Sequence, residues 1–186
     1  MNQLLAFPEE IEDFKQLQEL LLYGNQIQSL TPNINKLTRL RILGLSGNSI
    51  SRLPVEISEL SRLQTLALSA NQVKELPPEI GNLSSLIELR LNGNGLAVLP
   101  PEIGQLSKLH RLQLRRNRIS VLPSEIGFLL DLESLDLRGN ELRSLPPTIG
   151  RLTQLTRLDL RERNSDCAFP SEQPGPPTLA PAEPLN

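Results

Sequence analysis

Leucine and isoleucine recur along the chain in a pattern that repeats every 23 residues, with an asparagine always at the same place in it. The pattern LxxLxLxxNxIxxLPxEIxxLxx runs without insertion or deletion through six full repeats, which begin at residues 17, 40, 63, 86, 109 and 132. Its LxLxx segment alternates apolar and polar positions, which predicts a short β-strand. A fixed period of this length indicates a solenoid. The pattern therefore predicts a parallel sheet with one short strand per repeat.

The other side of each repeat is predicted to hold short helical turns or irregular chain. Counted from the first leucine of a repeat, apolar residues at frame positions 11, 14, 18 and 21 close the core, as Ile119 and Leu122 do in the fifth repeat. Proline at position 15 and glycine at position 19, such as Pro123 and Gly127, interrupt regular structure there. Because this side takes more room than the strands, we expect the stack to curve with the strands on the concave face.

Frame position 9 is an asparagine in every full repeat. The six residues are Asn25, Asn48, Asn71, Asn94, Asn117 and Asn140. A short amide can bond the backbone of a neighbouring turn, and a buried amide left unpaired costs about 1 to 3 kcal/mol. We therefore interpret the six asparagines as a structural ladder and not as ligand-binding residues.

The pattern continues, more weakly, beyond both ends of the full repeats. A partial repeat covers residues 2–16, and a degenerate seventh repeat begins at Leu155, with its asparagine one residue late at Asn164. We assign residues 1–164 to the repeat domain and 165–186 to a fraying end with a proline-rich disordered tail. The start inside a repeat and the proline-rich end suggest a truncated protein or a detached sensor domain.

The repeat resembles the leucine-rich repeat family, in its 23-residue class with the LPxEI signature, over roughly residues 2 to 164. It is similar in particular to the Ras-group proteins of plants and animal signalling scaffolds, and to Roco-type chains. The resemblance implies an α/β solenoid, a horseshoe with a parallel concave sheet. It also implies a non-catalytic role in protein–protein interaction during signalling, with a small GTPase or a kinase pathway.

Composition argues against several other classes of protein. A formal charge of -2 disfavours a dedicated nucleic-acid binder. The one histidine, His110, and the one cysteine, Cys167, are more than two repeats apart, which disfavours a catalytic triad or a multi-cysteine metal site. No signal peptide or membrane span is recognisable. We expect a cytoplasmic protein with no enzymatic activity, cofactor, metal or membrane partner, and the oligomeric state stays open.

The candidate binding surface is the concave face, where frame positions 3, 5, 7 and 8 point outward. Near the amino end it is small and partly apolar, with Leu21, Tyr23 and Ile42 as candidates. From the fourth repeat onward the candidates are Arg90, Arg111, Gln113, Arg115, Asp136, Arg138, Asp159 and Arg161. Position 7 stacks Arg115, Arg138 and Arg161 on strands about 4.8 Å apart, with aspartates beside them.

These arginines have two explanations that the sequence leaves open. They form a site for an acidic protein partner, or they pair with neighbouring acids on a solvated face. Nucleic acid is disfavoured because no aromatic residue interleaves the arginines. On the convex side Phe128 and Leu130 occupy normally polar positions and are a further candidate contact.

The leading hypothesis is a protein-binding scaffold that uses its concave sheet. The alternative is a sensing or autoinhibitory repeat domain of a larger signalling enzyme, such as a Roco-type GTPase, a kinase or a ubiquitin ligase.

Overall fold

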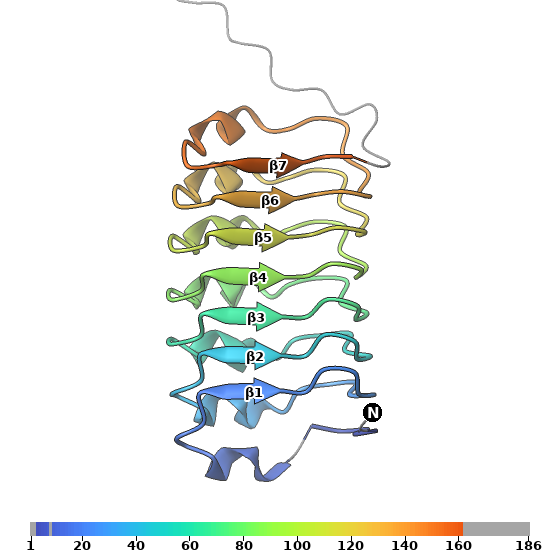
Figure 1. Ribbon diagram of the computed structural model, residues 1–186, viewed down its shortest axis with the longest axis vertical. Helices are drawn as coiled ribbons and strands as arrows, with labels where there is room; N and C mark the ends of the chain where they lie inside the picture. The colour runs from blue at the N-terminus through green and yellow to red at the C-terminus, as the bar shows by residue number, and fades with distance from the viewer. Residues whose placement is uncertain (1–2, 8, 162–186) are drawn as a thin grey trace, which may run out of the picture.

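The computed structural model describes residues 3–7 and 9–161, which form a stack of repeats with one parallel sheet along its length (Figure 1). The sheet has seven strands in chain order. They are β1 (Glu19–Leu21), β2 (Ile42–Gly44), β3 (Thr65–Ala67), β4 (Glu88–Arg90), β5 (Arg111–Gln113), β6 (Ser134–Asp136) and β7 (Arg157–Asp159). This confirms the predicted solenoid with one strand per repeat. The predictions for residues 162–186 lie outside the described residues.

The strands pair in a constant register, so the same frame position recurs along each row of the sheet. Leu43 pairs with Leu20 on one side and with Leu66 on the other. The same offset continues to the pair of Leu135 and Leu158. Each frame position therefore forms a row across the sheet, and the rows of positions 3, 5, 7 and 8 make up one surface, which we call the strand face.

The side opposite the strands consists of short 3-10 turns, as predicted. They are η1 (Glu9–Asp13), η2 (Pro32–Lys36), η3 (Val55–Glu59), η4 (Pro78–Asn82), η5 (Pro101–Gln105), η6 (Ser124–Phe128) and η7 (Pro147–Arg151). From η3 onward a proline precedes each turn; Pro100, for example, has φ -67° and ψ 146°. Proline fixes φ in this range and so sets the extended entry to the turn.

Glycine at frame position 19 lets consecutive turns approach closely. A Cβ on Gly104 would collide with the backbone oxygen of Glu125, and one on Gly127 would collide with that of Thr148. The missing side chain at this position therefore sets how tightly η5, η6 and η7 stack behind the sheet.

One continuous apolar core lies between the sheet and the turns. Its leucine, isoleucine and valine side chains are almost completely buried from Ile27 to Leu145. Among the described residues, contacts between elements join only neighbouring repeats. At the amino end Phe7 and Ile11 are buried, but Phe14 is 55% exposed although it continues the apolar pattern, because no described repeat packs on its outer side.

Candidate functional site

The asparagines of frame position 9 fix the turn that follows each strand. Asn117 Oδ1 accepts a hydrogen bond from the Leu96 amide at 3.1 Å, and its Nδ2 donates to the Leu91 and Leu114 carbonyls, each at 2.9 Å. The same three bonds recur at Asn48, Asn71, Asn94 and Asn140. Asn25 lies in the first full repeat and bonds Leu4 N and carbonyls of its own repeat. The ladder therefore connects successive repeats behind the strand face.

Frame position 8 requires a left-handed backbone conformation. Four repeats place glycine there, with φ between 64° and 72°: Gly24, Gly47, Gly93 and Gly139. The other two full repeats place Ala70 and Arg116 at φ 54° and 55°. A side chain in this conformation is strained relative to glycine. Arg116 therefore occupies a position where the fold favours glycine.

The amino half of the strand face has an apolar edge and a floor of small residues. Leu21 and Tyr23 are 54% and 46% exposed, whereas Ile42 is half-buried. The Tyr23 ring lies over Gly44, since a Cβ there would overlap the ring. Ala67 follows Gly44 in the same row and is buried. The glycine therefore makes room for the only tyrosine of the chain to lie across the sheet.

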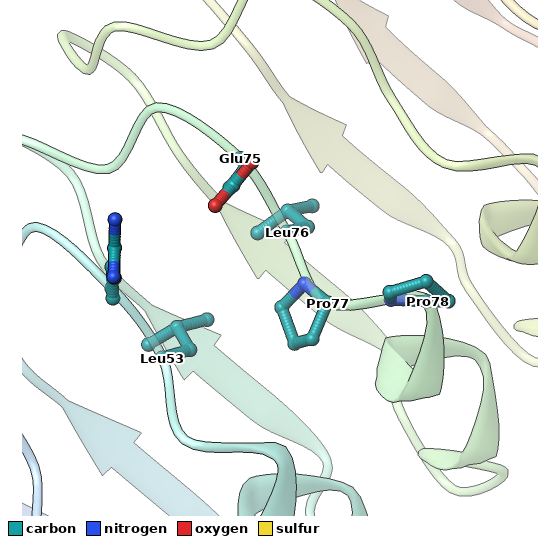
Figure 2. Close-up of a pocket in the computed structure, with 6 residues that line it drawn as sticks. Leu53, Glu75, Leu76, Pro77 and Pro78 are labelled. Atoms are coloured by element: carbon teal, nitrogen blue, oxygen red, sulfur yellow. The ribbon is translucent and has the colours of Figure 1, made fainter.

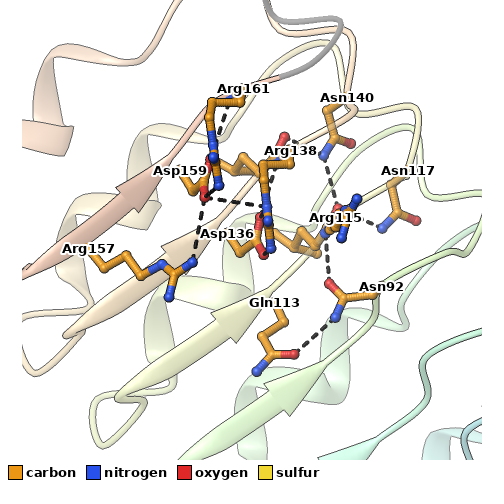
Figure 3. Close-up of polar contacts among 12 residues, drawn as sticks. Asn92, Gln113, Arg115, Asn117, Asp136, Arg138, Asn140, Arg157, Asp159 and Arg161 are labelled. Atoms are coloured by element: carbon orange, nitrogen blue, oxygen red, sulfur yellow. Dashed lines mark hydrogen bonds and ion pairs between the residues drawn. The ribbon is translucent and has the colours of Figure 1, made fainter.

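The centre of the strand face carries a polar network around Glu88. Its Oε2 accepts a hydrogen bond from Arg90 Nη2 at 2.8 Å, and its Oε1 accepts one from Gln113 Nε2 at 3.3 Å. Gln113 Oε1 in turn accepts from Asn92 Nδ2 at 2.9 Å (Figure 3). The hydrogen bond to Glu88 raises the pKa of Arg90 above its usual value, against the effect of burial. Both oxygens of Glu88 are thus occupied within the chain.

At the carboxyl end, arginines and aspartates of two neighbouring strands form a second network (Figure 3). Arg138 Nε bonds Asp136 Oδ1 at 2.9 Å and lies 3.4 Å from Asp159 Oδ2. Arg161 binds both oxygens of Asp159, through Nε at 2.9 Å and Nη2 at 2.8 Å. Arg157 Nη2 lies 3.7 Å from Asp159 Oδ2. Asp159 therefore holds three arginines of two repeats together.

Both aspartates of this network have lowered pKa values. The hydrogen bond from Arg161 lowers the pKa of Asp159 far below its usual range, against the effect of burial. For Asp136, burial acts to raise the pKa, but hydrogen bonds from Arg138 outweigh it and the pKa lies below its usual value. A shift in this direction means that folding favours the charged form of each carboxylate.

In the two networks the carboxylates lie closer to the sheet and most of the guanidinium groups lie nearer the solvent. The acid side chains of Glu88, Asp136 and Asp159 are 10%, 13% and 8% exposed, whereas those of Arg90, Arg157 and Arg161 are 43%, 62% and 70% exposed. The expectation that all positions 3, 5 and 7 face solvent is therefore wrong for these acids, because arginines of the same face cover them. Arg138 and Arg161 pair within the chain, in line with the self-paired explanation.

The fifth repeat differs from the repeats on both sides of it. Arg111 and Arg116 are exposed, and neither side chain forms a hydrogen bond or an ion pair within the part of the chain that the structure describes. The sequence pattern placed both at outward frame positions, 3 and 8, but only Arg111 was among the named partner-binding candidates. An arginine in a row where four of the six full repeats have glycine was the signal for Arg116.

Outside the strand face, one concave feature of the described residues is a pocket on the side of the turns. A shallow pocket of about 280 Å³ lies between the second and third repeats, at the entry to η3 and η4 (Figure 2). Its lining is Arg52, Leu53, Glu75, Leu76, Pro77 and Pro78, of which only Arg52 and Glu75 are charged. Within residues 3–7 and 9–161 no group of three His, Cys, Asp or Glu is placed to hold a metal ion.

Two apolar residues of the side opposite the strands are exposed, and the described helices are short. Phe128 and Leu130 are 53% and 56% exposed at and just after η6. In the described segments no helix has the length and apolarity needed to cross a lipid bilayer.

Comparison with known proteins shows the family. The profile of the leucine-rich repeat region matches residues 31–113 and 99–172. The chain therefore belongs to the leucine-rich repeat family. No curated protein matches the chain significantly in sequence.

Solved structures of the same fold come from plants and bacteria. The ectodomain of the plant membrane receptor kinase GASSHO1/SCHENGEN3 from Arabidopsis thaliana, in complex with CASPARIAN STRIP INTEGRITY FACTOR 2, is 36% identical with a TM-score of 0.77 over 88% of this chain. A leucine-rich repeat protein of Leptospira interrogans is 32% identical, with a TM-score of 0.62 over 89% of this chain. An internalin of Listeria monocytogenes is 26% identical, with a TM-score of 0.74 over 90%.

The chain spans only part of each of these proteins. It covers 20% of the plant ectodomain, 53% of the Leptospira protein and 52% of the internalin. The plant peptide hormone receptor RGFR1 in complex with RGF2, of which the chain covers 26%, is 33% identical over 88% of this chain with a TM-score of 0.77. The neighbours thus include receptors with bound protein or peptide partners, and they support a protein-binding repeat domain.

Proposed function

We propose that the chain is a non-catalytic scaffold whose strand face binds an acidic segment of a protein partner in intracellular signalling. One observation carries the proposal: the charge that the strand face presents from β4 to β7. Among the described residues this region holds seven arginines and three carboxylates, although the whole chain has a formal charge of -2. The arginines are Arg90, Arg111, Arg115, Arg116, Arg138, Arg157 and Arg161, and the carboxylates are Glu88, Asp136 and Asp159.

The rigidity of the face supports binding without a large ordering cost. Each strand is held by its neighbours in constant register, and the asparagine ladder fixes the turn after it. Side chains that are already positioned lose little conformational entropy when a partner docks. Complementary charge also speeds encounter and disfavours partners of the wrong sign. An acidic protein surface fits this face better than nucleic acid, since no aromatic residue lies among its arginines.

The proposal is tested by photo-crosslinking in extract of the source cells. A photoreactive amino acid at Ser69, on the strand face, is compared with one at Ser84, exposed just after η4 on the opposite side. We expect Ser69 to capture a specific protein that Ser84 does not, and capture to fall when the salt concentration rises. Equal capture from both positions would reject the strand face as the binding surface.

A second candidate function is a sensing or autoinhibitory domain of a larger signalling enzyme. It is favoured by the small share of the plant receptor-kinase ectodomain, 20%, that the chain covers. Sequencing the complete reading frame tests it, because a kinase, GTPase or ubiquitin ligase domain in the same frame would support this candidate. A complete reading frame without such a domain would count against this candidate and favour the scaffold function.

We also propose a cytoplasmic location, based on the sequence. Imaging of a tagged full-length protein in its source cells tests this proposal. Protease protection in intact cells would support it, and digestion by added protease would overturn it.

A further inference from the structure

Five of the seven arginines of the strand face form two groups that differ in their side-chain partners. Arg90, Arg138 and Arg161 bond carboxylates of the same face at 2.8 or 2.9 Å. Arg111 and Arg116 have no side-chain partner among the described residues. A guanidinium that already holds a carboxylate gains less from a second one than an unpaired guanidinium does. The two unpaired arginines are therefore the ones with most to gain from an acidic ligand.

The surroundings of Arg111 explain why it is unpaired. In the sheet it lies between Glu88 on β4 and Ser134 on β6. Glu88 is the nearest acid in this row, but its two oxygens accept from Arg90 and Gln113. Serine on the other side carries no charge. Arg111 therefore remains exposed beside an acid that bonds Arg90 and Gln113 instead.

Arg116 is unpaired for a different reason. Its row neighbours are Gly93 and Gly139, which have no side chains, and a Cβ on Gly139 would lie 3.3 Å from Arg116 Cγ. The residue itself has φ 55°, in a row where most repeats have glycine. Strained backbone at a surface residue is a recognised mark of functional positions. Strain, exposure and the lack of an internal partner coincide at this one arginine.

We infer that the fifth repeat is the point at which the strand face recognises carboxylates, with Arg111 at one end of β5 and Arg116 beyond the other. This inference rests on the proposed function and names the chemistry of the partner. The paired arginines on the flanking repeats hold the surface in shape and give it a positive field. The ligand is an acidic segment that runs along β5 and carries carboxylates at both ends.

The separation of the two arginines sets the spacing of those carboxylates. Five residue steps at about 3.3 Å put their Cα atoms at most ~17 Å apart. In an extended ligand, side chains four residues apart lie on the same face and span about 13 Å. Two acids with three residues between them therefore match Arg111 and Arg116 better than two adjacent acids do.

The test is an NMR titration of the ¹⁵N-labelled chain with blocked five-residue peptides. The probe has glutamate at both ends of a Gly-Ser-Gly spacer, and its analogue has glutamine in their place. We expect amide shifts centred on residues 111–116 with the glutamate peptide and at least tenfold weaker binding of the glutamine peptide. A peptide with two adjacent glutamates should bind about threefold more weakly than the spaced one.

Matched variants separate the site from the overall charge. The double variant Arg111→Gln and Arg116→Gln should weaken binding of the spaced peptide at least fivefold. The control variant Arg39→Gln and Arg62→Gln removes the same charge from exposed arginines outside the strand face and should change binding less than twofold. Thermal unfolding checks that both variants fold. If the repeat-five variant is misfolded, Arg116→Gly, which relieves the backbone strain, replaces it.

Four outcomes would overturn the inference: absence of shifts at millimolar peptide, equal binding of the glutamine peptide, shifts centred on β7, or equal weakening by the control variant. Repeating the Ser69 crosslink in the repeat-five variant separates this inference from the proposed function. Loss of the captured protein supports the inference. Unchanged capture overturns it and leaves the proposed function standing. Peptide binding at repeat five with no captured protein supports the inference and counts against the proposed function.

Discussion

The amino and carboxyl halves of the strand face share one buried framework but present different chemistry. In both halves the strand leucines pack inward in the same register, and Asn48 and Asn117 make the same three hydrogen bonds. The amino half shows Tyr23 lying across Gly44. The carboxyl half shows arginines above half-buried or buried acids. The repeat therefore separates residues that build the fold from residues that are free to specify a partner.

The largest effect is expected from the shared framework. Asn48→Ala and Asn117→Ala should each lower the free energy of unfolding by about 1 to 3 kcal/mol, because each leaves a buried backbone amide without a partner and removes one of the two asparagine bonds from each of two carbonyls. Urea unfolding with circular dichroism measures both. Similar losses would show that the two halves differ only at the surface. A loss at one position and none at the other would contradict a common ladder.

The next largest effect is a dependence of stability on pH, which we expect to arise in the carboxyl half. Asp159→Asn should lower stability by about 1 to 2 kcal/mol at neutral pH, because it weakens charge-assisted bonds to Arg138 and Arg161. The pKa of Asp159 is lowered on folding, so its contribution is complete above the unfolded value of about 3.9 and is lost as the pH falls below it.

Stability measured from pH 7 to pH 2 should therefore fall less steeply in Asp159→Asn than in the wild type. Thr65→Ala in the amino half removes a polar group without a charge and serves as the control. It should leave the slope unchanged. An identical slope in wild type and Asp159→Asn would contradict the role of this carboxylate.

A smaller effect is expected in the amino half. Gly44→Ala should displace the Tyr23 ring and cost less than about 1 kcal/mol, because the ring is partly exposed and can rotate away. The chain has one tyrosine and no tryptophan, so tyrosine fluorescence reports on this ring alone. We expect Gly44→Ala to change the emission intensity and Ala67→Gly to leave it unchanged. Unchanged emission in both would show that the ring does not lie over Gly44 in solution.

The smallest effect concerns the two strained residues, one in each half. Ala70→Gly and Arg116→Gly should each stabilise the fold by up to about 0.5 kcal/mol, since relief of the left-handed strain slightly exceeds the entropy cost of glycine. Thermal unfolding measures the change. Only Arg116→Gly should weaken binding of the acidic peptide. Weakening by Ala70→Gly as well would indicate that turn rigidity, rather than the guanidinium, governs binding.

Period and residue type together predicted the fold. The period of 23 placed each strand, and proline and glycine at fixed positions placed each turn, because these features depend on local backbone preference and on a core that repeats. The structural role of Asn117 was predicted from the same recurrence every 23 residues. The finer likeness to Ras-group or Roco-type proteins stays a prediction.

The candidate site was less accessible from the sequence. Which residues share the strand face followed from the alternation of the pattern. The pairing of the arginines did not follow from the sequence, because it depends on side-chain conformations that the repeat period does not determine. Arg138 contacts acids on two strands, and Glu88 accepts hydrogen bonds from Arg90 and Gln113. The Tyr23 ring contacts Gly44, which has a different frame position in the adjacent repeat. Comparing equivalent positions of the repeats does not predict such a contact.

In residues 3–7 and 9–161, contacts between elements join only neighbouring repeats, so these repeats are connected in series. A pull on the two ends loads every interface in series, so the weakest one yields first and the rest keep their shape. A ligand that bridges the fifth repeat and its neighbours would reinforce the links it spans. Under tension an interface outside the bound segment would then open first, and the bound segment would stay closed longer.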